Sequence, residues 1–95
     1  MALVALVTLQ AMTVRVTQEH IAGAERNTLD NPVVRALCHT TVTPWRIFGC
    51  ICAVELAPPH RTIVLPPEVK SLLSDYLTTN NMSPFEFIAW MKQPL

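Results

Sequence analysis

Apolar and polar residues alternate along the chain with two different periods, that of strands and that of helices. The segment 12–17 alternates at every residue, with Met12 and valines on one face and Thr13 and Arg15 on the other. A period of two predicts a strand that is buried on one face. The preceding residues 2–9, ALVALVTL, are mostly apolar, so they either extend this strand or form a separate one.

Three segments carry the signals of helices. Thr17 is suited to cap a short helix, and Asn31 caps a second one because the proline that follows it loses no needed N–H at the first helical position. The strongest helix begins at Pro66–Pro67 and ends at Asn80, since Asn tolerates the left-handed conformation of a C-cap. Its apolar face, at helical spacing, consists of Val69, Leu72, Leu73, Tyr76 and Leu77.

Residues 45–56 are predicted to form one long strand that is apolar on both faces. The two faces consist of Trp45, Ile47, Ile51 and Ala53 on one side and of Phe48, Cys50, Cys52, Val54 and Leu56 on the other. A strand of this kind is expected to be covered on both sides. A turn over 57–60 returns the chain as a strand over 61–65, and a final strand is expected over 85–91.

The order of these elements predicts the fold class. We expect an α+β fold with an antiparallel or mixed sheet of about four strands, one long helix and two short helices. The 95 residues are enough for one domain, 1–95, with a single core. Within it, residues 1–11 are expected to be an N-terminal extension or an extra strand.

The composition narrows the classes of function. Hydrophobic residues make up 51% of the chain, charged residues 15%, and the formal net charge is zero; this excess of apolar residues points to a buried partner surface. The cations are scattered among acids, so the footprint of a nucleic-acid-binding protein is missing. The N-terminus lacks the basic region of a signal peptide and is shorter than the ~20 apolar residues of a membrane span. We therefore expect a cytoplasmic protein without a membrane role.

The three cysteines, Cys38, Cys50 and Cys52, are an odd number, which is typical of reduced thiols in a cytosolic compartment. On one strand, Cys50 and Cys52 would share a face and could bind a metal only with two more ligands. The available donors are Cys38, His20, His39 and His60. Their spacing matches no zinc pattern, so we interpret the cysteines as small packing residues, with metal binding and redox chemistry as alternatives, and expect no metal or cofactor.

No arrangement of residues in the sequence indicates an enzyme. It contains no Gly-x-Ser-x-Gly elbow, phosphate-binding loop or paired carboxylates at fixed spacing. His20 is expected to cap its helix or to pack against the first strand, and His60 to be exposed. The aromatic residues, Trp45, Trp90, Phe85 and Phe87, form either a stacking platform for single-stranded nucleic acid or, as we favour, a core or dimer interface.

Four short motifs follow one another along the chain. They are Met12–Ile21 (MTVRVTQEHI), Asn31–Leu37 (NPVVRAL), Val64–Leu73 (VLPPEVKSLL) and Ser83–Phe87 (SPFEF). This order resembles a group of small uncharacterised proteins that are common in tailed bacteriophages and prophages. Two departures are that those proteins often carry Cys where Asn31 stands, and tend to begin where Met12 stands. The resemblance implies an accessory protein of phage type acting in a bacterial cytoplasm, and it implies no activity.

Together these observations predict a binding protein that acts by stoichiometric contact with a host protein, as a host-takeover or anti-defence inhibitor similar to anti-CRISPR proteins. Homodimerisation is a further expectation. The expected interface residues are Trp45, Ile47, Ile51 and Trp90. The alternatives are a nucleic-acid-binding regulator and a protein that sequesters a small nucleotide. In the latter case, Arg15, Arg35 and Arg61 are the expected anion contacts.

Overall fold

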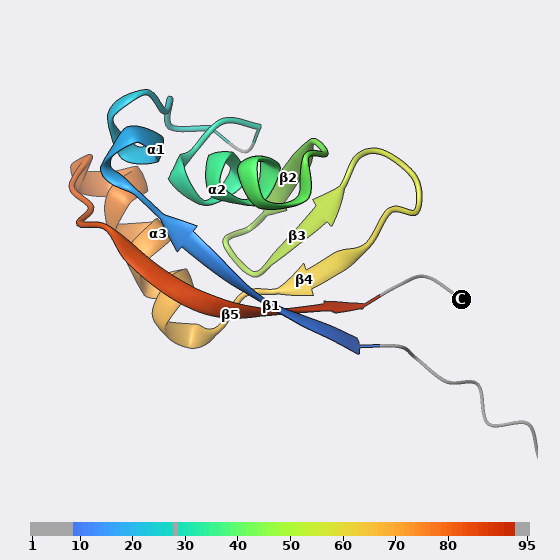
Figure 1. Ribbon diagram of the computed structural model, residues 1–95. Helices are drawn as coiled ribbons and strands as arrows, with labels where there is room; N and C mark the ends of the chain where they lie inside the picture. Colours follow the sequence, from blue (N-terminus) through green and yellow to red (C-terminus); the bar gives the residue numbers. More distant parts are fainter. Residues whose placement is uncertain (1–8, 28, 93–95) are drawn as a thin grey trace, which may run out of the picture.

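The computed structural model describes residues 9–27 and 29–92, and over these residues the chain forms five strands and three helices (Figure 1). The elements are β1 (Leu9–Val16), α1 (Gln18–Ala22), α2 (Pro32–Thr41), β2 (Trp45–Phe48), β3 (Cys52–Glu55), β4 (Thr62–Val64), α3 (Pro67–Thr79) and β5 (Phe85–Lys92). The strands form one antiparallel sheet in the order β1-β5-β4-β3-β2. The predicted α+β class is confirmed, with one strand more than the expected four.

The first strand begins earlier than the alternation of residues 12–17 indicated. β1 starts at Leu9, and its first three residues pair with the end of β5, from Leu9 opposite Lys92 to Ala11 opposite Trp90. Residues 9–11 are therefore part of the sheet. The strand or extension expected for residues 1–8 lies outside the described residues.

Two helices begin, and one ends, at the residues that the capping signals predicted. Thr17 caps α1, and Asn31 caps α2 by accepting a hydrogen bond at Oδ1 from the Val34 N–H at 2.9 Å. Asn80 ends α3 in the left-handed conformation at φ 61°, where its N–H donates to the Tyr76 carbonyl at 2.8 Å. These three positions are confirmed because capping depends on residues that are adjacent in the sequence.

The expected long strand over residues 45–56 is wrong, because a tight turn divides it into β2 and β3. Gly49 and Cys50 have φ of 58° and 57°, and the Ile51 N–H donates to the Phe48 carbonyl at 3.0 Å. Two successive left-handed residues are typical of type I′ turns, which match the twist of the strands they connect. Gly49 was the one local signal of this turn, and the apolar residues around it concealed the reversal.

The core lies on one face of the sheet. In each strand the buried residues alternate with exposed or half-buried ones, and the buried set packs with α2 and α3 in a single cluster. The cluster contains Val14, Val16, Val33, Val34, Ala36, Leu37, Trp45, Ile47, Ala53, Ile63, Leu65, Val69, Leu73, Tyr76, Phe87, Ala89 and Met91. Within the described part of the chain, the helices cover one face of residues 45–56, and the cover expected on the other face stays a prediction.

Two of the expected interface residues are also corrected by this packing. Trp45 is 1% exposed and Ile47 is 2% exposed, because both point from β2 into the core beneath α2. A side chain that its own chain already buries cannot contact a partner. Ile51 and Trp90 are more than half exposed, so they stay available for an interface.

Candidate functional site

The face of the sheet that the helices leave uncovered carries a continuous row of apolar residues, which we call the belt. Ala11 lies opposite Trp90 in the β1–β5 ladder, and Phe48 lies opposite Cys52 in the β2–β3 ladder. Cys52 in turn pairs with Val64, and the register of the β4–β5 ladder, if continued by one residue, places Val64 opposite Trp90. The belt, from Ala11 through Trp90, Val64 and Cys52 to Phe48, thus crosses the sheet from β1 to β2.

The belt is long and exposed. Val64 is 74% exposed, Trp90 56% and Phe48 44%, although all three are large apolar residues. Because neighbouring strands lie about 4.8 Å apart, a row that crosses five strands extends over about 19 Å. Ile88, which is 48% exposed, lies beside it on β5. An apolar patch of this continuity marks an interaction surface more often than a chance distribution of residues does.

Charged residues flank the belt unequally. The row on one side begins with Lys92 and ends with Arg46, linked by the pairs Lys92–Thr62, Thr62–Val54 and Val54–Arg46. The Arg46 guanidinium carbon lies 5.0 Å from the centre of the Phe48 ring, within the range of a cation–π contact. On the other side Arg15 pairs with Glu86 at 3.3 Å. The residues around the belt thus carry three cations and one carboxylate.

The structure separates the two cysteines that the sequence placed on one strand face. Cys50 lies in the turn after β2, whereas Cys52 lies in β3 as part of the belt. All three cysteines are free thiols and half-buried, so the interpretation as core residues is only partly correct. Among the described residues, no group of three or more His, Cys, Asp or Glu residues is placed to hold a metal ion.

Of the aromatic residues considered as a platform, the structure exposes one. Trp90 belongs to the belt, whereas Trp45 and Phe87 are in the core and Phe85 is half-buried against it. The Phe85 and Phe87 rings stack at 6.0 Å on the core side of β5. The aromatic residue that accompanies Trp90 on the open face is Phe48, which the sequence had placed with the cysteines.

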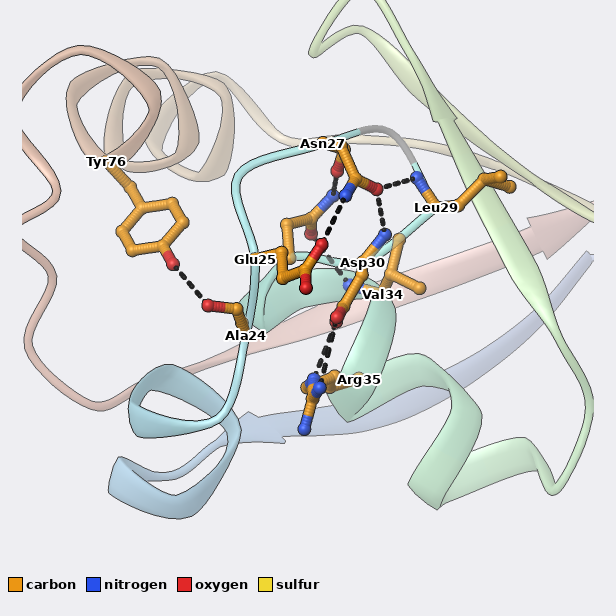
Figure 2. A network of polar contacts seen from close by, with 9 residues as sticks. Ala24, Glu25, Asn27, Leu29, Asp30, Val34, Arg35 and Tyr76 are labelled. Carbon is orange, nitrogen blue, oxygen red and sulfur yellow. Dashed lines mark hydrogen bonds and ion pairs between the residues drawn. The ribbon is translucent and has the colours of Figure 1, made fainter.

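Two of the three arginines expected to contact anions are held by carboxylates. Arg35 donates from Nε and Nη2 to both oxygens of Asp30, at 2.6 and 3.0 Å, and this lowers the pKa of Asp30 (Figure 2). Arg61 makes the same two-point contact with Glu55, at 3.0 and 2.8 Å. Arg15 has only its single contact with Glu86, with both side chains well exposed. Arg15 is therefore the arginine of this set that is free to rearrange.

A network of backbone contacts fixes the connection between α1 and α2 and with it the position of Arg35. Figure 2 shows Asn27 at the centre, where its Oδ1 accepts hydrogen bonds from the backbone N–H groups of Leu29 and Asp30 at 2.9 and 2.7 Å. From α3, the Tyr76 hydroxyl donates to the Ala24 carbonyl at 3.4 Å. These bonds hold Asp30 in position for Arg35, so this network is structural.

Glu55 is a buried charge that the sequence interpretation did not single out. Its carboxylate is fully buried and accepts hydrogen bonds from the Thr43 hydroxyl at 2.6 Å and from the backbone and side chain of Arg61. The Arg61 hydrogen bonds, together with that of Thr43, lower the pKa of Glu55 to about 2. Thr43 also contacts Thr41, which accepts from the Trp45 indole N–H at 2.7 Å. An acidic residue in an apolar strand, followed six residues later by Arg, was the available signal.

A second candidate site, which we call the edge cleft, lies beside β1 and has a volume of about 420 Å³. It is lined by Thr13, Arg15, Thr17, His20, His39 and Thr40. His20 Nδ1 accepts a hydrogen bond from the Thr17 N–H at 3.0 Å and completes the capping box of α1, which confirms the expected capping role. Because a backbone N–H can only donate, the His20 proton is on Nε2, which lies 3.2 Å from His39 Nδ1.

This proton position determines what the histidine pair can do. Nε2 of His20 donates to Nδ1 of His39, so His39 keeps its own proton on Nε2 as a free donor. A metal shared by the two rings would have to displace the Nε2 proton of His20, and Nδ1 could take up that proton only by losing the Thr17 hydrogen bond. Burial, followed by the proximity of His39, lowers the pKa of His20, which favours the neutral ring.

Comparisons with known proteins found no match: no protein-family model, no curated protein and no solved structure matches the chain. Within the described residues, no helix is both long enough and apolar enough to cross a membrane. The candidate sites are thus defined by their geometry, as an apolar belt on the open face of the sheet and a polar cleft along its β1 edge.

Proposed function

We propose that the protein acts by stoichiometric binding to a folded partner protein that covers the belt. The observation that carries this proposal is the exposed apolar row from Ala11 to Phe48, on the sheet face that the three described helices do not cover. Trp90 at its centre is of the residue type that most often dominates the energy of protein interfaces. In this proposal the protein is a binding protein and not an enzyme.

The charges beside the belt specify the chemistry of the partner. Arg46 and Lys92 flank one side, and the Arg15–Glu86 pair on the other side is neutral. A second copy of the same face would bring two more cations into the contact, whereas a surface with carboxylates around an apolar ridge would neutralise them. We therefore assign the belt to a different protein with an acidic rim, in preference to the homodimer.

The sequence resemblance leads us to propose where that partner is found. The motifs from Met12 to Phe87 resemble those of small phage proteins, and a phage accessory protein acts on proteins of the bacterial cytoplasm. We therefore propose a host protein as the target and a role in host takeover or anti-defence inhibition, similar to anti-CRISPR proteins. Stoichiometric occupation of a target needs a stable scaffold with an exposed face, which the described fold supports.

The proposal is tested by photo-crosslinking in a host lysate. A photoreactive phenylalanine analogue at position 64, in the belt, is compared with the same analogue at position 78, on the exposed side of α3. From position 64 we expect one discrete adduct whose mass corresponds to one copy of each protein. Excess unlabelled wild-type protein should suppress this adduct, and excess Val64→Glu variant should not. Equal adducts from both positions, or no adduct at position 64, would overturn the assignment.

The open face also supports the nucleic-acid-binding alternative through one observation. Trp90 and Phe48 are exposed on the sheet, and Arg46 lies over the Phe48 ring at 5.0 Å; exposed aromatic residues with nearby cations are how many proteins stack single-stranded bases. The formal net charge of zero weighs against it. Binding of single-stranded oligonucleotides that weakens strongly with salt, and is lost in Trp90→Ala, would favour this alternative over a protein partner.

A further inference from the structure

The β1 edge of the sheet is open in the described part of the chain. β1 is eight residues long and pairs there with β5 alone, as Figure 1 shows at the blue end of the sheet. The opposite edge strand, β2, has half that length. Unpaired edges of long strands are sites where another strand can add, and natural proteins usually protect them with proline, bulges or charge. From Leu9 to Thr13, β1 contains none of these.

The orientation of the backbone at this edge follows from the contacts of His20. The Thr17 N–H donates to Nδ1 of the His20 ring at 3.0 Å, and that ring lies beside His39 of α2. In an antiparallel strand the N–H and C=O of one residue point to the same side, and successive residues alternate. The odd-numbered residues of β1 therefore direct their backbone groups away from β5. His20 occupies this edge near Thr17, and within residues 9–27 and 29–92 no backbone group pairs with the outer side of Ala11 or Thr13.

The walls of the edge cleft show that it follows this edge. The Thr13 and Arg15 side chains belong to the open face of the sheet, whereas His39 and Thr40 belong to α2 in the helix layer. A cleft that is lined from both faces must lie along the edge between them. Its volume of about 420 Å³ is within the range of about 300–1,000 Å³ that is usual for ligand sites.

The chemistry of the walls defines the occupant. The described lining residues contribute three threonine hydroxyls, the Arg15 guanidinium and the imidazole of His39, and no carboxylate. The contact of Arg15 with Glu86 is single and exposed, and exposed ion pairs contribute little stability. A carboxylate that is held in the cleft can therefore compete with Glu86 for the guanidinium.

We propose that the edge cleft binds an extended peptide segment that adds to β1 as a further strand, with an acidic side chain against Arg15 and His39. The main chain of the segment pairs with the free groups of Ala11 and Thr13, and the acidic side chain sets its register. This site adjoins the belt at Ala11, but it uses the backbone edge of β1 and takes a different kind of ligand. The proposal therefore goes beyond the proposed function and does not depend on it.

The test uses labelled peptides and fluorescence anisotropy. The probe is Val-Thr-Val-Glu-Val-Thr, and its controls replace the central Glu by Lys or methylate the backbone nitrogens on alternate residues. We expect the Glu peptide to bind about tenfold or more tightly than either control, since a charged hydrogen bond contributes about 1.5–3 kcal/mol. Equal binding of the Glu and Lys peptides, or of the methylated peptide, would overturn the proposal.

Three variants test whether peptide binding depends on the β1 edge. Thr13→Pro removes one unpaired N–H and leaves the β5 ladder intact, so it should stay folded and lose about tenfold in affinity or more, whereas Val14→Pro should unfold the sheet. Arg15→Ala should weaken the Glu peptide and not the Lys peptide, which keeps the test valid if Thr13→Pro misfolds. The Val64→Glu variant should bind the peptide normally. Loss of partner binding at the belt can therefore be distinguished from loss of peptide binding at the edge.

A second copy of the chain is the competing occupant of this edge. Sedimentation of the protein without peptide decides the question, because a β1-to-β1 dimer would dissociate in Thr13→Pro. A monomer that binds the Glu peptide supports the proposal. A dimer that Thr13→Pro separates, and that excludes the peptide, would overturn it.

Discussion

Both faces of the sheet carry large apolar side chains, which are buried on one face and exposed on the other. The inner face, with Trp45, Ile47 and Ile63, is almost entirely buried by the helices, whereas the outer face exposes Val64 and Trp90 more than halfway. Adjacent residues such as Ile63 and Val64 differ only in the direction in which they point. The difference shows that cover by the helices, and not hydrophobicity, distinguishes the core from the belt.

The same contrast holds for the ion pairs. On the inner side, Arg61 and Glu55 have exposed side-chain fractions of 17% and 0%, and three donor atoms of Arg61 contact the carboxylate. On the outer side, Arg15 and Glu86 are 75% and 59% exposed and share one contact of 3.3 Å. A buried pair is strongly destabilising to break, because one charge is left without a partner, and an exposed pair is not.

The largest expected difference in stability is between a charge placed on the inner face of β4 and one placed on its outer face. Ile63→Glu buries an unpaired carboxylate and should cost about 5 kcal/mol or more, enough to unfold a domain of this size. Val64→Glu should change the free energy of unfolding by less than about 1 kcal/mol and should prevent partner binding at the belt. Circular dichroism and urea denaturation of the two variants check this, and similar stabilities would contradict the assignment of the faces.

The two tryptophans give the next largest contrast. Trp45→Ala removes a buried ring and its hydrogen bond to Thr41, and we expect a loss of about 3–5 kcal/mol. Trp90→Ala, at a position that is 56% exposed, should lose about 1 kcal/mol or less while weakening partner binding. Urea denaturation provides the measurement, with far-UV spectra as the control for folding. A larger loss for Trp90 than for Trp45 would reverse the comparison.

Acid should destabilise the fold through the buried Arg61–Glu55 pair. The pKa of Glu55 falls from its ordinary 4.5 to about 2 in the folded protein, so this carboxylate stabilises the fold fully above pH 4.5 and loses that contribution as the pH falls towards 2. The contribution amounts to about 3 kcal/mol. Urea midpoints measured between neutral pH and about pH 2 should fall in the wild type, and Glu55→Gln should lower the neutral value and flatten the decline. A variant with the wild-type slope would refute this role.

The smallest expected effect is that of the outer pair. Glu86→Gln removes the only carboxylate that Arg15 contacts among the described residues, and we expect the free energy of unfolding to change by about 0.5 kcal/mol or less. The same urea titration provides the measurement. This variant is also the matched control for Glu55→Gln, because both remove one charge of one ion pair. A cost near that of Glu55→Gln would show that exposure does not separate the two pairs.

The sequence predicted those features that depend on neighbours along the chain. The caps at Thr17, Asn31 and Asn80 and the one buried face of the strand from Met12 were expected correctly, because capping and alternation are local. The turn at Gly49–Cys50 was not, since apolar residues continue through it and only one glycine marks it. Glu55 was also missed, because its burial depends on Arg61 and on packing by distant elements.

The candidate sites were less predictable than the fold. Trp90 was expected at an interface, but the belt joins it to Val64 and Phe48 through strand pairing that no local pattern specifies. His20 was expected to cap α1, but its contact with His39, 19 residues away, arises only when α2 packs beside α1. Pairing between distant segments therefore set the limit of what could be inferred.

The place of β5 in the sheet has a consequence for how the protein is made. β5 is the last of the described strands in chain order, and it lies between the first strand and the β2–β3–β4 meander (Figure 1). Of the described strands, β1 leaves the ribosome first, and its described partner β5 exists only once residues 85–92 have been synthesised. The sheet can therefore close only after β5 has been synthesised, and until then the nascent chain exposes β1 to chaperones and other proteins.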